Sequence, residues 1–219
     1  MNKNKREDDM KDTNKIYDIL YNKFGEAKCE LDFSNTYELI VAVILSARCT
    51  DKRVNIITKD LFKKYPTVES LANAKLEELE KMIYSCGFYK NKAKNLIAMA
   101  KDVFEKFNGI VPDEFEQLTS LAGVGRKTAN VVMAVGFSKQ AIAVDTHVFR
   151  VSNRLGIVKA KNPLDCELAL QKVVEKNKWA QFHHFLVLFG RYVCKSQNPN
   201  CKDCELCNYC EYIKNNIKN

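Results

Sequence analysis

The sequence predicts an all-α protein of 219 residues. Apolar residues recur along most of the chain at the three- and four-residue spacing of a helix. Eight glycines and four prolines are few enough to leave room for long helices. The alternating pattern of a strand is lacking, apart from a short ambiguous segment at 140–144. With 46% hydrophobic and 28% charged residues, the chain has the composition of a globular protein with one large or two small domains.

Turn signals divide the chain into the expected helices. The first should cover residues 37–45, with Ser34 as its N-cap, because apolar residues there share one helical face. Dipeptides that end in glycine or proline mark breaks at 65–66, 86–87, 108–109, 111–112 and 162–163. The later helices are expected at 51–65, 75–84, 90–107, 126–136, 145–155, 163–177 and 179–192.

The charge of the chain favours a polyanionic partner. Its 35 basic and 27 acidic residues give a net charge of +8 and a pI of about 8.9. The longest apolar run, at 39–45, is too short to cross a bilayer, so no membrane partner is expected. The N-terminal segment 1–12 is charged and has no apolar signal region, so we expect a cytoplasmic protein.

Residues 121–129, LAGVGRKTA, predict a tight turn that opens into a helix. Gly123, Val124 and Gly125 would present backbone amides to a phosphate, with Arg126 adding positive charge nearby. Lys127 falls in the first helical turn, where the positive end of the helix dipole disfavours the ammonium form and so favours a nucleophilic amine. The alternative is a plain turn followed by a solvated lysine.

The cysteine spacing near the C-terminus predicts a metal or cluster site. Cys194, Cys201, Cys204 and Cys210 follow the pattern C-x6-C-x2-C-x5-C, and four thiolates on a short loop can hold zinc or a cubane iron–sulfur cluster. The spacing lacks the paired C-x2-C knuckles of most zinc ribbons, which favours the cluster. Cys207 creates a competing set at ferredoxin-like spacing with Cys201, Cys204 and Cys210, and the sequence leaves this choice open.

Together these features resemble the endonuclease III family of helix-hairpin-helix DNA glycosylases. The resemblance runs from about residue 32 to 210, and it is carried by the cysteine spacing and by LSARCTD (45–51), GFYKNKA (87–93), LAGVGRKTANVV (121–132), VDTHVFRVSNRLG (144–156) and HHFLVLFGRYVC (183–194). It implies a six-helix domain at 29–139, with the helix-hairpin-helix motif at 118–136. It also implies a second helical domain made of 1–28 and 140–219, whose loop 194–210 would bind a [4Fe–4S] cluster.

The resemblance implies a bifunctional DNA N-glycosylase and abasic-site lyase of base excision repair. Lys127 stands at the family's nucleophile position and would attack C1′ of the deoxyribose as an oxidised pyrimidine leaves. The resulting Schiff base would nick the strand 3′ to the abasic site by β-elimination. Asp145, at the family's carboxylate position, would accept the lysine proton or stabilise charge on the sugar, and it also fits a helix N-cap. The expected partner is duplex DNA with oxidised pyrimidines or abasic sites, bound by a monomer at the nucleoid.

Four further residues match positions that contact DNA in the family. Arg48 stands where the family usually has a glutamine that fills the gap left by the flipped base, and Phe88 stands where a leucine wedge is common. Arginine can hydrogen-bond the orphaned base, but its charge and geometry leave the opposite-base preference open. Ser46 and Asp51 match positions that line the site. Phe88 could instead cover the core, and Ser46 and Asp51 could serve as caps or hydrogen-bonding structure.

Two other functions fit parts of the sequence. An adenine-mismatch glycosylase of the same superfamily would lack Lys127, carry a glutamate near Ser46 and have an extra C-terminal domain, whereas this chain ends nine residues after Cys210. A non-catalytic iron–sulfur protein that binds DNA or senses redox state, or a zinc-stabilised one, would not need an amine paired with a carboxylate. The presence of both Lys127 and Asp145 therefore favours the bifunctional enzyme.

Overall fold

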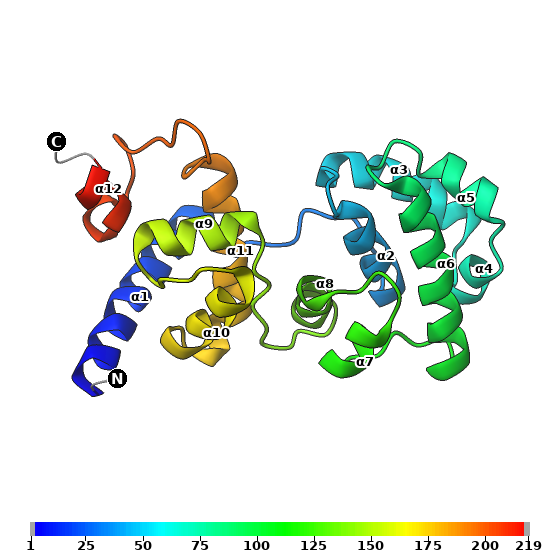
Figure 1. Cartoon of the computed structure of the whole chain (residues 1–219), viewed down its shortest axis with the longest axis horizontal. Helices are drawn as coiled ribbons and strands as arrows, with labels where there is room; N and C mark the ends of the chain where they lie inside the picture. Colours follow the sequence, from blue (N-terminus) through cyan, green and yellow to red (C-terminus); the bar gives the residue numbers. More distant parts are fainter. Residues whose placement is uncertain (1–2, 217–219) are drawn as a thin grey trace. The chain divides into compact units, whose positions relative to one another are not determined.

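The computed structural model describes residues 3–216, and this part of the chain consists of helices and loops without any strand (Figure 1). The all-α prediction is confirmed. The ambiguous segment at 140–144 forms no strand: residues 141–144 are buried there in a connection outside any helix. None of the helices in the described part combines the length and hydrophobicity needed to cross a membrane.

Contacts between residues divide the chain into two compact units. One unit comprises residues 29–139, and the other combines 1–28 with 140–219. The chain therefore leaves one unit after its first helix and returns to it once the other unit is complete. Each unit has its own set of buried apolar side chains.

The 29–139 unit is built around α2 (Thr36–Ser46). Tyr37 and every residue from 39 to 45 are buried, and a helix that is apolar on all its faces is stable only inside a core. This helix packs against α3, α6 and α8. The other helices of the unit are α3 (Asp51–Lys64), α4 (Val68–Ala72), α5 (Leu76–Met82), α6 (Tyr89–Lys106), α7 (Phe115–Ser120) and α8 (Arg126–Val131), with a π-helical turn at Val132–Gly136.

Two expectations for this unit are wrong. The N-cap of α2 is Asn35 rather than Ser34, because the Asn35 side chain accepts a hydrogen bond from the Glu38 amide at 2.9 Å. The unit also contains seven α-helices instead of six. A capping box formed by Thr67 and Ser70 starts the short helix α4 independently of α5, and the periodicity of five residues is too short to predict such a helix.

The second unit contains five α-helices in its described residues. They are α1 (Lys3–Phe24), α9 (Thr146–Leu155), α10 (Pro163–Val173), α11 (Trp179–Tyr192) and α12 (Glu211–Asn216). The helix α11 packs against α1 and α9, and α10 and α12 also contact α9 (Figure 1). The helix α10 ends before the expected residue 177 because Val174 and Glu175 adopt extended backbone conformations.

Aromatic residues of α11 form the centre of the core in the second unit. Phe182, Phe185 and Phe189 are at most 1% exposed. Gly190 lets α11 approach α9 closely, since a Cβ atom at this position would lie 2.8 Å from the Cβ atom of His147. The start of α9 is thereby held against a rigid neighbour.

Candidate functional site

The predicted hairpin joins α7 to α8 through a turn at 121–125. Leu121 and Val124 anchor the turn in the core, and the Val124 amide donates a hydrogen bond to the Leu121 carbonyl at 3.1 Å. Gly123 has a φ of +77°, which L-residues with side chains rarely adopt. A Cβ atom at Gly123 would also lie only 2.9 Å from the Cβ atom of Asn95 on α6. The turn therefore requires glycine here both for its conformation and for its contact with α6.

The surroundings of Gly125 are different. This residue is the N-cap of α8 in extended conformation, and a Cβ atom added to it would meet no protein atom within 4 Å. A glycine N-cap supplies no side chain to the first turn of the helix. The open space around Gly125 thus allows an external anion to approach the start of α8, where the helix dipole attracts negative charge.

The two basic residues that follow are arranged differently. The Arg126 guanidinium lies over the Phe115 ring of α7, 4.7 Å from the ring centroid, so it ties the two helices of the hairpin together. Lys127 is the second residue of α8 and is exposed. An exposed amine in the first turn of a helix, beside an open glycine turn, can reach a group bound at that helix end.

Asp145 lies in the second unit, where it is the N-cap of α9. Its Oδ1 atom accepts hydrogen bonds from the amides of His147 and Val148, both at 2.8 Å. Both bonds fall on Oδ1, so the cap does not use the second carboxylate oxygen. The ring of His147 does not hold Asp145: its Nδ1 lies 3.2 Å from a guanidinium nitrogen of Arg150. His147 contacts Asp145 through its backbone amide, which donates a hydrogen bond to Oδ1.

Arg48 and Phe88, which are 40 residues apart in the sequence, form one contact in the structure. The Arg48 guanidinium lies 5.2 Å from the centroid of the Phe88 ring. Both residues have positive φ, 54° and 59°, although neither is glycine, and such strain gathers at functional positions. Phe88 is 62% exposed, so the interpretation that it covers the core is wrong.

Ser46 and Asp51 flank the Arg48 turn. Ser46 is the last residue of α2, and its hydroxyl donates to the Val43 carbonyl at 2.9 Å. Asp51 is the first residue of α3, whose N-cap is Thr50. Ser46 therefore makes a local structural bond, and the capping role considered for Asp51 belongs to its neighbour.

The cysteine loop lies in the second unit. Burial raises the pKa of Cys204 to about 11 and also raises the pKa of Cys210, and the nearby thiols of Cys194 and Cys201 raise both further. These four thiols are therefore close enough to interact electrostatically. Cys207 is not among those neighbours, and its sulfur contacts the side chain of Asn208 instead.

The donors around this loop suit a negatively charged thiolate centre. The backbone amide of Leu206 hydrogen-bonds Cys204, and those of Tyr212 and Ile213 hydrogen-bond Cys210, which favours the thiolate forms. The Arg154 guanidinium donates to the sulfur of Cys194 at 3.5 Å. As they stand, no three His, Cys, Asp or Glu side chains among residues 3–216 are arranged to hold a metal ion. The chemistry of four neighbouring, partly or fully buried thiols, three of which accept hydrogen bonds, nevertheless fits an iron–sulfur cluster.

Comparison with known proteins identifies the family. Residues 41–176 match the model of the HhH-GPD superfamily of base excision DNA repair proteins. Endonuclease III of Bacillus subtilis (strain 168) is 50% identical over 194 residues, which are 88% of this chain and 89% of the relative. The chain belongs to the endonuclease III family.

Solved structures agree with this membership. An endonuclease III in a trapped covalent intermediate with DNA, an estranged-adenine complex, is 44% identical with a TM-score of 0.91, and the match covers 95% of this chain and 98% of that one. A thermostable thymine-DNA glycosylase is 25% identical with a TM-score of 0.83, over 95% of this chain and 98% of that one. As an endonuclease III family member, the chain is a base excision repair enzyme, a DNA glycosylase with lyase activity.

Two residues of this endonuclease III family member support the site although the sequence did not single them out. Asn95 packs against Gly123 and so helps to fix the hairpin. Lys92 is only 6% exposed, and its ammonium donates to the carbonyls of Leu45 and Ala47 at the end of α2. Burial lowers the pKa of Lys92. Only the position of Lys92 within the quoted motif GFYKNKA could have drawn attention to it.

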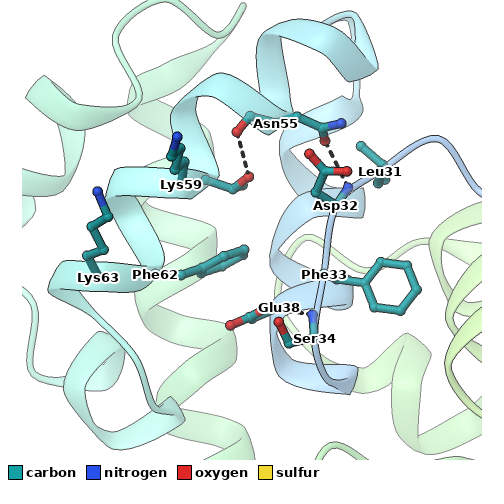
Figure 2. Close-up of a pocket in the computed structure, with 10 residues that line it drawn as sticks. Leu31, Asp32, Phe33, Ser34, Glu38, Asn55, Lys59, Phe62 and Lys63 are labelled. Carbon is teal, nitrogen blue, oxygen red and sulfur yellow. Dashed lines mark hydrogen bonds between the residues drawn. The ribbon is translucent and has the colours of Figure 1, made fainter.

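A cavity of about 610 Å³ lies beside α3, away from the predicted site residues (Figure 2). Phe62 points into it from α3, and Asp32, Glu38, Lys59 and Lys63 bring charges of both signs to its walls. None of the residues predicted to bind DNA or to catalyse the reaction lines this cavity. It is therefore separate from the hairpin and from the Arg48–Phe88 contact.

Substituting each hairpin glycine by alanine should show that the fold needs glycine at position 123 but tolerates a side chain at position 125. Gly123→Ala should lower the free energy of unfolding by about 2–3 kcal/mol, because alanine is strained at positive φ and its methyl group would clash with Asn95. Gly125→Ala should cost about 1 kcal/mol or less, because only the N-cap preference is affected. Urea unfolding followed by far-UV circular dichroism measures both. Equal losses in the two variants would contradict the assignment of separate roles to these glycines.

Proposed function

We propose that this enzyme removes oxidised pyrimidines from duplex DNA and nicks the strand 3′ to the abasic site, with Lys127 as the nucleophile and Asp145 as its carboxylate partner. The observation that carries the proposal is the exposed Lys127 amine in the first turn of α8, directly after the open Gly125 turn. A phosphate bound at this turn would bring a deoxyribose within reach of the amine.

The proposed reaction forms and breaks bonds in sequence. The neutral Lys127 amine attacks C1′ of the damaged nucleotide, the bond from C1′ to the base breaks, and the base leaves with its electron pair and gains a proton. The sugar ring opens to give an iminium ion between Nζ and C1′. Loss of a proton from C2′ then expels the 3′ phosphate, which nicks the strand, and water releases the lysine from the sugar fragment.

Asp145 suits the role of base or electrostatic partner. Its Oδ1 atom is fixed by two amides at the start of α9, so the carboxylate cannot rotate freely. The remaining oxygen could then take a proton from the Lys127 ammonium, which frees the neutral amine for attack, or stabilise positive charge on the sugar. The covalent DNA intermediate trapped for a 44% identical endonuclease III supports chemistry of this kind.

The net charge of +8 of the whole chain and the open turn before α8 support binding of duplex DNA. The backbone of Gly123, Val124 and Gly125 would contact a phosphate, with Arg126 beside it. Arg48 and Phe88 would enter the duplex, where the flat Phe88 ring replaces stacking and the guanidinium hydrogen-bonds the orphaned base. Ser46 and Asp51 would line the nearby surface. Because the proposed substrate is genomic DNA, we propose that the enzyme acts at the nucleoid. We also propose that it acts as a monomer.

The cofactor that we propose is a [4Fe–4S] cluster held by Cys194, Cys201, Cys204 and Cys210. When bound, the cluster would bond to all four thiolates and so hold the loop 194–210 in one rigid conformation. The interactions among these four thiols, in which Cys207 takes no part, support this set over the ferredoxin-like one.

Borohydride trapping tests the lyase proposal. The native protein should cross-link to an oligonucleotide with an abasic site, because borohydride reduces the iminium ion to a stable amine. Lys127→Ala should abolish the cross-link, whereas Lys101→Ala, which removes an exposed lysine of α6, should not. Denaturing gels of the reduced mixtures measure the result. Absence of a cross-link from the native protein would overturn the proposal.

Asp145→Asn separates capping from chemistry. Asparagine caps helices about as well as aspartate, so the free energy of unfolding should change by less than about 0.5 kcal/mol. Base-release turnover should fall by about 10²–10⁴-fold, because the variant lacks the basic carboxylate. Single-turnover base release and urea unfolding measure the two effects. Turnover at the native rate would remove Asp145 from the mechanism.

Two cysteine substitutions test the ligand set. Cys194→Ser should weaken or abolish the broad visible absorption of an iron–sulfur cluster, because one of four ligands is replaced. Cys207→Ser should leave the absorption unchanged. Visible spectroscopy and iron analysis of the purified variants measure this. The opposite pattern would support the ferredoxin-like set, and a colourless native protein that contains zinc would contradict the cluster.

A further inference from the structure

Arg48 and Phe88 adopt conformations that their own residue types disfavour. The left-handed backbone is unfavourable at a non-glycine residue, and here two such residues lie in contact. Arg48 follows Ala47, the C-cap of α2, and so occupies the helix-terminating position where glycine is usual. Phe88 is the N-cap of α6, where Ser, Thr, Asp or Asn is usual. Something else in the unit must hold these two turns in place.

Lys92 is bonded to both turns. Its ammonium donates to the Leu45 carbonyl at 2.8 Å and to the Ala47 carbonyl at 2.6 Å, which satisfies the end of α2 directly before Arg48. Its backbone amide donates to the Phe88 carbonyl at 3.1 Å. The positive charge also lies at the negative end of the α2 dipole. One residue thus connects the ends of two helices that carry the exposed pair.

The two turns also touch directly. Gly87, just before Phe88, is packed so closely against the Arg48 turn that an added Cβ atom would lie 3.2 Å from the Arg48 carbonyl oxygen. Arg48 and Phe88 expose their side chains to solvent, whereas the side chains of Leu45 and Lys92 beneath them are buried. A buried lysine bonded to backbone carbonyls, beneath two exposed and strained side chains, is arranged to support those side chains.

We propose that Lys92 is a positioning residue that holds Arg48 and Phe88 as one pre-formed wedge for insertion into duplex DNA. This inference rests on the proposed function, since it concerns how the wedge is kept ready. Because the wedge is formed before DNA arrives, binding does not have to order the two turns while the damaged base is extruded. Lys92 itself touches neither DNA nor the reacting atoms.

The test compares a step that needs the wedge with one that does not. Extrusion of a base is required in duplex DNA, whereas an abasic site in a single strand is already accessible. Lys92→Met keeps the length of the side chain but removes its donors and charge. It should lower kcat/KM for base release from a duplex by about ten- to a hundredfold, while cross-linking to a single-stranded abasic oligonucleotide changes far less. A 2-aminopurine opposite the damaged nucleotide should show a smaller fluorescence change on binding.

Matched variants separate positioning from general stability. Lys101→Met removes an exposed lysine of the same helix and should leave both reactions at native rates. Lys92→Arg retains N–H donors and should recover most of the duplex activity, and it also serves if Lys92→Met does not fold. Adding Lys92→Met to a variant that carries Arg48→Ala and Phe88→Ala should cause little further loss, because residues that act through one another are not additive.

The outcomes distinguish this inference from the proposed function. Equal losses on duplex and single-stranded DNA, native duplex activity in Lys92→Met, or additive losses in the combined variant would each overturn the positioning role. A native protein that fails to cross-link even to single-stranded abasic DNA would instead overturn the proposed function.

Discussion

The close packing of Gly123 against Asn95 fixes where α8 begins, and the proposed chemistry depends on that point. Because the turn takes a left-handed conformation with no room for a side chain, Val124 returns to the core and Gly125 becomes an open N-cap. Lys127 then falls in the first turn of the helix. A shift of one residue would rotate the amine by about 100° around the helix axis. The position of the proposed nucleophile is thus set by backbone packing rather than by a partner of the lysine.

The other candidate residues also lie at helix ends. Arg48 follows the end of α2, Phe88 caps α6, and Asp145 caps α9. Helix ends have backbone groups without partners inside the helix, so they can bind anions, fix carboxylates or be held by a buried cation such as Lys92. The apolar helix α2 and the aromatic core of α11 provide the rigid support that keeps these ends in place.

Local patterns predicted most of the fold and the hairpin, because helical periodicity and glycine turns depend on neighbouring residues. The capping role of Asp145 could be predicted for the same reason. The contact of Arg48 with Phe88 and the role of Lys92 could not, because they join segments about 40 residues apart. Ser34 and Asn35 are both good N-caps, and the sequence signal that favours Asn35 is Glu38, which stands three residues later at the capping-box spacing. The resemblance to endonuclease III pointed to Arg48 and Phe88 but not to what holds them.

The central claim is that the amine of Lys127 bonds to a deoxyribose carbon. Tandem mass spectrometry of the borohydride-reduced complex, after digestion by a protease and a nuclease, tests it most directly because it locates the bond on one side chain. We predict that the sugar fragment is attached to Nζ of Lys127. Attachment to another lysine or to the N-terminal amine would contradict the account.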